Sequence, residues 1–208
     1  MRSETPEAVR QRFVGAIAGT GSTSGVRVVV GRWDDSPWGP FADVMVETAA
    51  GHRVLLAPDA RVTDFVASTY HFDELREEPV SVRSEPGAWT VLTPSLRLWL
   101  VTGGRTPLGR LLSVVPSPVA ASPAWCAVTD PVARVALRGV RTRGGVRAGR
   151  RSFYGALDVV AVTGLRGSFD GLDLGTLADV DPPCRFGFSS VPRRPSVTRV
   201  VTTVDVHG

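Results

Sequence analysis

The chain has 208 residues, of which 43% are hydrophobic and 21% charged; this is the composition of a folded globular protein and excludes a disordered or fibrous one. The formal net charge of +4 is too small to indicate by itself a nucleic-acid-binding protein. All 24 basic residues are arginine, a bias that a GC-rich genome produces without any functional cause.

Cysteine and histidine are sparse. Cys126 and Cys184 lie far apart in no zinc-binding spacing, so we expect two thiols of a reducing compartment, no metal site and no cofactor. The N-terminus has charges through its first dozen residues and lacks the apolar core of a secretory signal. The longest uncharged run, 111–129, contains three prolines, which argues against a membrane-spanning helix. We therefore expect a soluble, cytoplasmic protein without a membrane partner.

The N-terminal segment predicts a helix followed by a linker. Thr5-Pro6 is a typical helix start, and Val9, Phe13 and Ile17 recur every four residues, which predicts an amphipathic helix over about 6–18. The glycines and hydroxyls of 19–25 predict a flexible linker rather than a phosphate-binding loop, because no strand precedes them. We therefore divide the chain into residues 1–25, a helix and linker, and residues 26–208, a single β-rich domain.

The segment that follows is rich in β-branched and aromatic residues between turn signals. Pro94-Ser95 predicts a tight hairpin, and the residues after Pro58 predict a helical turn. The predicted strands are 26–33, 41–48, 52–58, 68–75, 79–84, 88–93 and 96–102.

In the rest of the chain, a segment with helix signals comes before further predicted strands. Thr, Ser or Asp followed by proline predicts one or two short helices between Pro107 and Val128. A long hairpin follows over 133–163, and 196–206 is a closing strand rich in valine and threonine. Without regular strand–helix alternation, the pattern favours a mainly β fold: an antiparallel β-barrel or double-sheet sandwich, with the N-terminal helix and one or two short covering helices.

Residues 138–155 contain six arginines and no acid. Gly144-Gly145 is a favoured two-residue hairpin turn, and it would pair Arg143 with Val146 and Arg138 with Arg151. Three interpretations remain open. The segment is an exposed ribbon, an anion site in which Arg141 and Arg143 hold a carboxylate or phosphate above Tyr154, or a nucleic-acid-binding arm. The weak net charge makes nucleic acid the least favoured partner.

Two polar residues suggest an acid–base pair. In a strand over 68–75, His71 and Asp73 would lie on the same face, together with Thr69. A histidine near an aspartate is typical of general acid–base catalysis, although neighbouring positions on one strand face are roughly 6.5–7 Å apart, which strains a direct hydrogen bond. A partly exposed polar face is the alternative interpretation.

Aromatic residues gather near the end of the first predicted strands. Trp33 and Trp38 stand among prolines and acids, where they would either line the mouth of a ligand cavity or cap a barrel end. The favoured hypothesis is therefore a small-molecule-binding β-barrel whose ligand has an apolar body and an anionic head. The alternatives are an enzyme that uses the same cavity with His71 and Asp73, and a non-catalytic structural or protein-interaction domain. The oligomeric state has no signal in the sequence.

Overall fold

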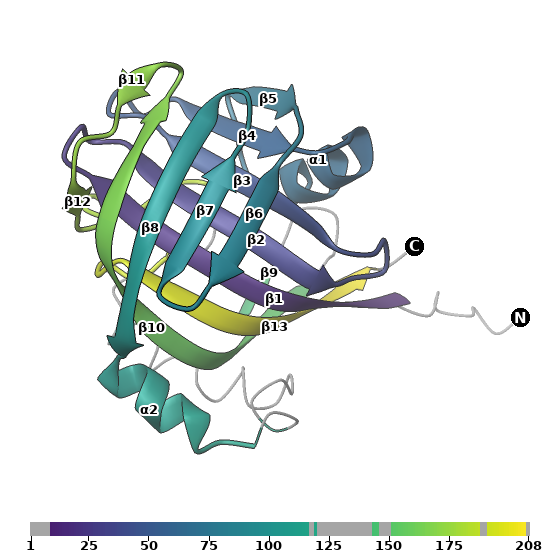
Figure 1. Cartoon of the computed structure of the whole chain (residues 1–208). Helices are drawn as coiled ribbons and strands as arrows, with labels where there is room; N and C mark the ends of the chain where they lie inside the picture. Colours follow the sequence, from purple (N-terminus) through teal and green to yellow (C-terminus); the bar gives the residue numbers. More distant parts are fainter. Residues whose placement is uncertain (1–8, 117–118, 120–142, 146–150, 188–190, 207–208) are drawn as a thin grey trace, which may run out of the picture.

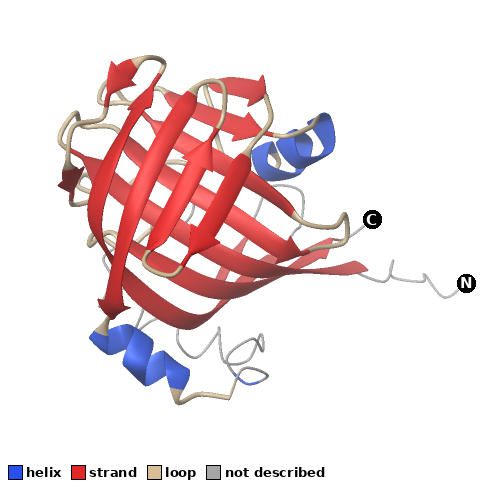
Figure 2. Cartoon of the chain, in the orientation of Figure 1, coloured by secondary structure: helices blue, strands red, loops and turns tan. Residues whose placement is uncertain are grey.

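The computed structural model describes the chain except residues 1–8, 117–118, 120–142, 146–150, 188–190 and 207–208. Strand is the main secondary structure of the described chain, which has two short helices, as Figures 1 and 2 show. The helices are α1 (Ala60–Ala67) and α2 (Pro107–Ser113). The strands are β1 (Val9–Ser22), β2 (Arg27–Asp35), β3 (Phe41–Glu47), β4 (Arg53–Ala57), β5 (Glu74–Glu77), β6 (Ser81–Glu85), β7 (Ala88–Leu92), β8 (Leu96–Arg105), β9 (Arg143–Gly145), β10 (Arg151–Phe169), β11 (Leu172–Asp173), β12 (Leu177–Ala178) and β13 (Ser196–Val206).

Ten of these strands form one continuous sheet in the order β5-β4-β3-β2-β1-β13-β10-β8-β7-β6. The pairs are antiparallel except β4 with β5. The sheet curls on itself, so that β6, β7 and β8 lie in front of β1 to β4 in Figure 1. The predicted mainly β class is confirmed, and the sheet is a curled half-barrel.

The concave face of this sheet is filled. Residues at alternate positions of β1 to β4, such as Val28 and Val44, pack against Leu98 and Leu100 of β8 and against Phe169 of β10. These side chains are nearly inaccessible to solvent, so burial of apolar surface here holds the two ends of the curled sheet together. The interior of the half-barrel is therefore a packed core and not the ligand cavity.

The N-terminal helix prediction is wrong, because residues 9–22 form β1 at the centre of the sheet. A spacing of four residues fits a strand face as well as a helix face, since four is a multiple of the strand period of two. Phe13 and Ile17 lie on one face of β1, and Ala16 and Ala18 lie in the core on the other. The predicted linker is also wrong: Gly19 to Ser22 belong to β1, and only the next three residues form the turn to β2.

The prediction of a strand over 68–75 is wrong in its first half. Helix α1 continues into a turn, and the strand begins only at Glu74. Both helices begin as the sequence indicates: Asp59 caps α1 by accepting a hydrogen bond from the Val62 amide at 2.9 Å, and Thr106 caps α2 ahead of Pro107. The strands predicted over 26–33, 41–48, 79–84, 88–93, 96–102 and 196–206 are confirmed within a few residues.

The predicted hairpin register is wrong as well. Gly144 and Gly145 lie in β9, where they pair with Ser152 and Arg151 of β10, and Arg143 pairs with Phe153. Gly144-Gly145 is therefore not the turn, and Arg151 faces Gly145 instead of Arg138. Arg138 and Arg141 lie outside the described residues, as does Cys126.

Candidate functional site

The convex face of the sheet carries a cavity of about 170 Å³. Its floor is formed by β3, β2, β1, β13 and the first residues of β10, and the registers arrange the floor in rows across the strands. One row runs Asp43, Gly31, Ile17, Thr198, and a second runs Met45, Val29, Gly19, Ser196. Because adjacent strands are about 4.8 Å apart, each row of four spans about 14 Å. Each row contains a glycine, and a neighbouring side chain lies close above it: the Asp43 carboxyl group above Gly31, and Val191 above Gly19.

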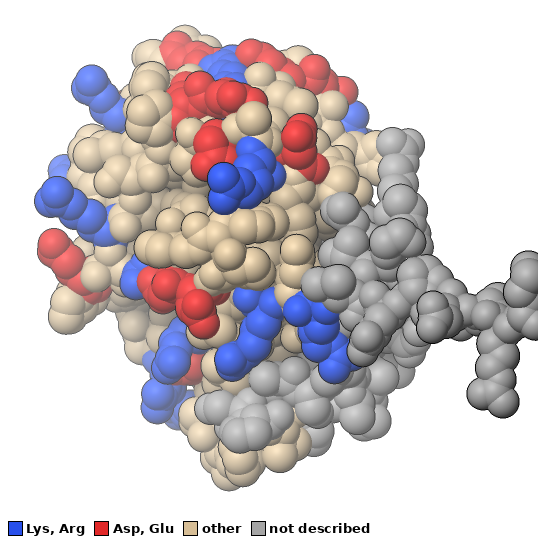
Figure 3. All heavy atoms as spheres, turned by 90° about the vertical axis from the view of Figure 1, so that its right-hand side faces the viewer, with Lys and Arg blue, Asp and Glu red and all other residues tan. Residues whose placement is uncertain are grey.

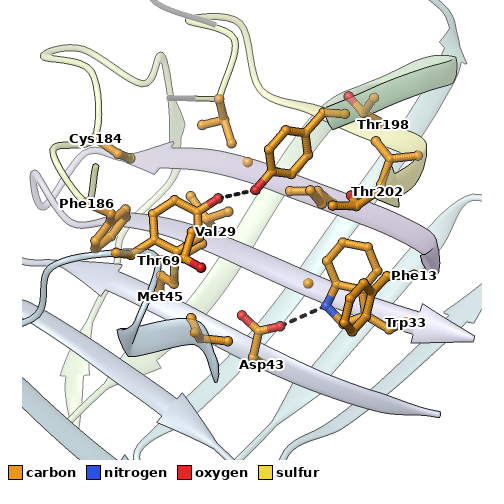
Figure 4. Close-up of a pocket in the computed structure, with 18 of the residues that line it drawn as sticks. Phe13, Val29, Trp33, Asp43, Met45, Thr69, Cys184, Phe186, Thr198 and Thr202 are labelled. Carbon is orange, nitrogen blue, oxygen red and sulfur yellow. Dashed lines mark hydrogen bonds between the residues drawn. The ribbon is translucent and has the colours of Figure 1, made fainter. Parts of the chain in front are cut away.

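Two covering elements form the walls. Helix α1 contributes Phe65 and Val66, and its C-terminal turn contributes Thr69 and Tyr70. The segment between β12 and β13 contributes Cys184 and Phe186, which pack with Val29 of the floor. In Figure 4, Cys184 and Phe186 lie at one end of the cavity, and Asp43, Trp33 and Phe13 lie at the other.

A buried ion pair holds the second covering segment in place. Glu47 at the end of β3 is inaccessible to solvent and lies 3.1 Å from Nη2 of Arg27, which is itself buried. Arg27 also donates to the Pro182 carbonyl at 2.9 Å, and the Arg185 amide donates to Oε2 of Glu47 at 2.8 Å. Removing one partner of a buried ion pair leaves the other charge uncompensated, so this pair fixes Cys184 and Phe186 against the sheet.

Asp43 is the acid of the cavity. It is only 4% exposed, and the indole Nε1 of Trp33 donates a hydrogen bond to its Oδ1 at 3.0 Å (Figure 4). Burial raises the pKa of Asp43 from 3.8 to about 6, and the Trp33 hydrogen bond opposes this shift. A carboxyl group in an apolar cavity that titrates near neutral pH is a common mark of a functional site.

Hydroxyl groups provide the other polar atoms. The hydroxyls of Tyr70 and Tyr154 lie 2.6 Å apart, and burial raises the pKa of Tyr154 to about 12 and that of Tyr70 as well. On β13, Ser196 Oγ and Thr202 Oγ1 are buried with no hydrogen-bond partner among the described residues. A buried hydroxyl without a partner costs about 1–3 kcal/mol, so a ligand with a polar group would gain by meeting it.

Of the predicted site residues, the structure brings two to the cavity. Trp33 and Tyr154 line it, whereas Trp38 packs behind the lining, with its ring centroid 5.6 Å from Phe13 and 4.9 Å from Phe65. Arg143 belongs to β9, but its side chain, like the whole of Arg141, lies outside the description. Both arginines therefore stay predictions.

His71 and Asp73 do not line the cavity. His71 is exposed, and the Asp73 carboxylate receives two hydrogen bonds from the Arg53 guanidinium, at 2.8 and 2.9 Å. This bidentate contact holds the pKa of Asp73 well below its usual range, so the carboxylate is a poor proton acceptor. Their role as an acid–base pair stays a prediction. Among the described residues, no group of three acids, histidines or cysteines could hold a metal ion.

Sequence reasoning missed Asp43, Tyr70 and Gly31 as site residues. Alternation in β3 places Asp43 and Val44 on opposite faces of the strand. From the sequence alone, a polar residue at this position fits a solvent-exposed face as well as a covered one. Only the position of α1 and of the segment before β13 makes that face a cavity.

The fold and site thus define a mostly β protein with an apolar cavity against the convex face of a curled sheet. No protein-family model matches the chain, and no curated protein matches it. Among solved structures, acetoacetate decarboxylase from Legionella pneumophila subsp. pneumophila matches over 100% of this chain and 89% of its own, with 9% identity and a TM-score of 0.41. A similarity this low carries no argument about activity. No helix in the described part of the chain is long and apolar enough to cross a membrane.

Proposed function

We propose that the protein binds a small, largely apolar molecule in the convex-face cavity. The observation that carries this proposal is a cavity with aromatic and aliphatic walls that contains a buried carboxyl group and two hydroxyls without partners among the described residues. Such polar groups destabilise a protein when they have no partner, and a few of them in an apolar pocket are typical of ligand sites.

The volume limits the ligand to a single ring or a short hydrocarbon chain. A cavity of about 170 Å³ is close to the ~150 Å³ of an engineered apolar cavity that binds benzene, and it is well below the ~300 Å³ at which pockets begin to hold drug-sized molecules. We therefore expect fewer than about ten non-hydrogen atoms in the ligand.

The anionic head expected from the sequence depends on Arg141 and Arg143. No arginine, lysine or histidine is present in the described lining, where Asp43 is the acid. An anionic head would therefore need those two arginines, or a protonated Asp43 that donates a hydrogen bond to it.

Binding is tested with toluene and benzyl alcohol, followed by ligand-observed NMR. Saturable binding to the parent protein is expected, and it should be lost in Ile17→Phe, because the larger side chain fills the floor row between Gly31 and Thr198. Val101→Phe, at an exposed position of β8, is the matched control and should bind as the parent does. If neither ligand binds the parent saturably, the proposal is wrong for this size class.

A proton-transfer enzyme is the second candidate, and Asp43 favours it. With a pKa of about 6, this carboxylate is ionised at neutral pH yet basic enough to accept a proton from a carbon next to a carbonyl group. The test is exchange of the acetophenone methyl protons for deuterium in D₂O, measured by NMR, with Asp43→Asn as the inactive variant. Exchange no faster than in buffer alone would rule out this activity for such ketones.

A further inference from the structure

We propose that the ligand of the cavity is a small organic cation, a primary amine on one ring or a short hydrocarbon chain, with its ammonium group against Asp43. This inference rests on the proposed binding function and gives its ligand a chemical class. It reverses the sign of the head group that the arginine-rich segment predicts.

The first support is the small number of hydrogen bonds that Asp43 accepts from the described residues. Trp33 donates to Oδ1, and no hydrogen bond reaches Oδ2 from any described residue. A buried carboxylate is usually surrounded by several donors, because each one replaces part of its lost hydration. An ammonium group brings three donors and a compensating charge to this oxygen.

The second support is the position of the Asp43 carboxyl group next to a glycine of the neighbouring strand. Gly31 is paired with Asp43 across β2 and β3, and a Cβ at this glycine would lie 2.5 Å from Oδ1 and 2.9 Å from the Trp33 indole nitrogen. Because Gly31 has no side chain, the carboxyl group and the indole lie against the strand at this point, and both residues line the cavity. A ligand whose head lies at Asp43 would place its body over Ile17, toward Thr198, which lies on the other side of the cavity in Figure 4.

The third support is the set of aromatic rings around this end of the cavity. The ring centroids of Phe13 and Phe65 are 5.0 Å apart, and those of Trp33 and Phe41 are 6.3 Å apart, all four in the lining. Aromatic rings attract organic cations through their quadrupoles, and a cage of rings with an acid is a recurrent ammonium site. An organic anion would gain nothing from the ring faces and would meet the charge of Asp43.

No described cation competes for Asp43. The other titratable groups of the lining are Tyr70 and Tyr154, which face Asp43 from the α1 turn and from β10, and Cys184, whose pKa burial raises to about 12. Arginines on the adjacent strands are already paired: Arg32 lies 2.6 Å from Asp34, and Arg27 lies 3.1 Å from Glu47. Figure 3 shows acidic and basic side chains together on one outer face of the molecule.

The experiment compares four ligands with the same ring: benzylamine, benzyl alcohol, toluene and benzoate. Each is titrated by calorimetry or NMR into the parent protein, Asp43→Asn and Asp64→Asn at pH 5 and pH 7. Asp64 is exposed on α1, so its substitution changes the net charge equally without touching the cavity.

At pH 7 we expect benzylamine to bind the parent and Asp64→Asn at least about tenfold more tightly than benzyl alcohol does, and Asp43→Asn to lose this preference. The amine stays protonated across this range, as a lysine does. Because Asp43 has a pKa of about 6, its ionised fraction falls about tenfold between pH 7 and pH 5, and benzylamine affinity should fall by the same factor. Toluene should still bind saturably to all three proteins, which also shows that Asp43→Asn is folded.

Two results would overturn the inference and leave the proposed function intact. One is toluene and benzyl alcohol binding without any preference for benzylamine. The other is benzoate binding more tightly than benzylamine, which would point to the arginines instead of Asp43. If none of the four ligands binds, the proposed function itself fails, so the two failures are distinguishable.

Discussion

The two faces of the central strands differ although their residues alternate along the same segments. On the concave face, Val30 and Val44 lie in a filled core, and one residue away, on the convex face, Gly31 and Asp43 line the cavity. The core face maximises apolar burial, and the cavity face keeps a carboxyl group in a place that raises its pKa. The apolar core and the proposed binding site thus lie on opposite sides of one sheet.

The largest expected difference between the two faces is the loss of stability when a large side chain is truncated. Leu98 is completely buried in the concave core, so Leu98→Ala should lower the free energy of unfolding by about 2–5 kcal/mol. Met45→Ala removes a half-buried side chain that already borders empty space, so a loss below about 2 kcal/mol is expected. Denaturant unfolding monitored by circular dichroism measures both. Equal losses would mean that the cavity side is packed as tightly as the core.

Asp43→Asn should stabilise the protein at neutral pH. The folded state raises the pKa of Asp43 from 3.8 to about 6, so it holds a proton that the unfolded chain releases, and stability falls as pH rises from about 4 to 6. Above pH 6 the penalty is complete and amounts to about 2–3 kcal/mol, since one pKa unit is worth about 1.4 kcal/mol. Asparagine has no such penalty. Unfolding curves at pH 4 and pH 8 should show a gain only at pH 8, and Asp64→Asn should show none.

Gly31→Ala should displace the Asp43–Trp33 pair. The new methyl group would lie 2.5 Å from Oδ1, so the Asp43–Trp33 pair must move, and overpacking of this kind costs about 1–3 kcal/mol. Gly104→Ala is the matched control, because no atom lies within 4 Å of a Cβ there. Thermal unfolding and Trp fluorescence report both effects. A Gly31→Ala protein as stable as the control would show that this end of the cavity has more room than the strand pairing implies.

The smallest expected effect concerns Thr202. Its hydroxyl is buried without a partner among the described residues, so Thr202→Val should raise the free energy of unfolding by about 1 kcal/mol. Thr203→Val on the same strand is the control for a change in β propensity. A loss of stability in Thr202→Val would show that the hydroxyl has a partner, for instance a bound water, and is not kept for a ligand.

Local patterns in the sequence were enough to predict most strands, the start of α2 and the closing strand over 196–206, because these depend on alternation and on residues a few positions apart. They failed at β1, where the spacing of Val9, Phe13 and Ile17 fits a helix and a strand equally. They failed again at Gly144-Gly145, where a favoured turn pair lies inside a strand. In both places the long-range pairing with β13 or β10 overrides the local preference.

By itself, the sequence determined that this chain folds as a mainly β protein. Apolar residues that alternate along a strand give a sheet one apolar face, and that face must be buried against another part of the chain. It also indicated Trp33 as a candidate for a cavity wall because of its aromatic ring, whereas Tyr154 was predicted from a hairpin register that the structure does not have. Only the tertiary structure decided that the cavity lies on the convex face, that Asp43 is its acid, and that His71 and Asp73 lie outside it. The reason is physical, because the pKa of a carboxyl group depends on the distant segments that cover it. Here those segments are α1 and the residues held by the Arg27–Glu47 pair.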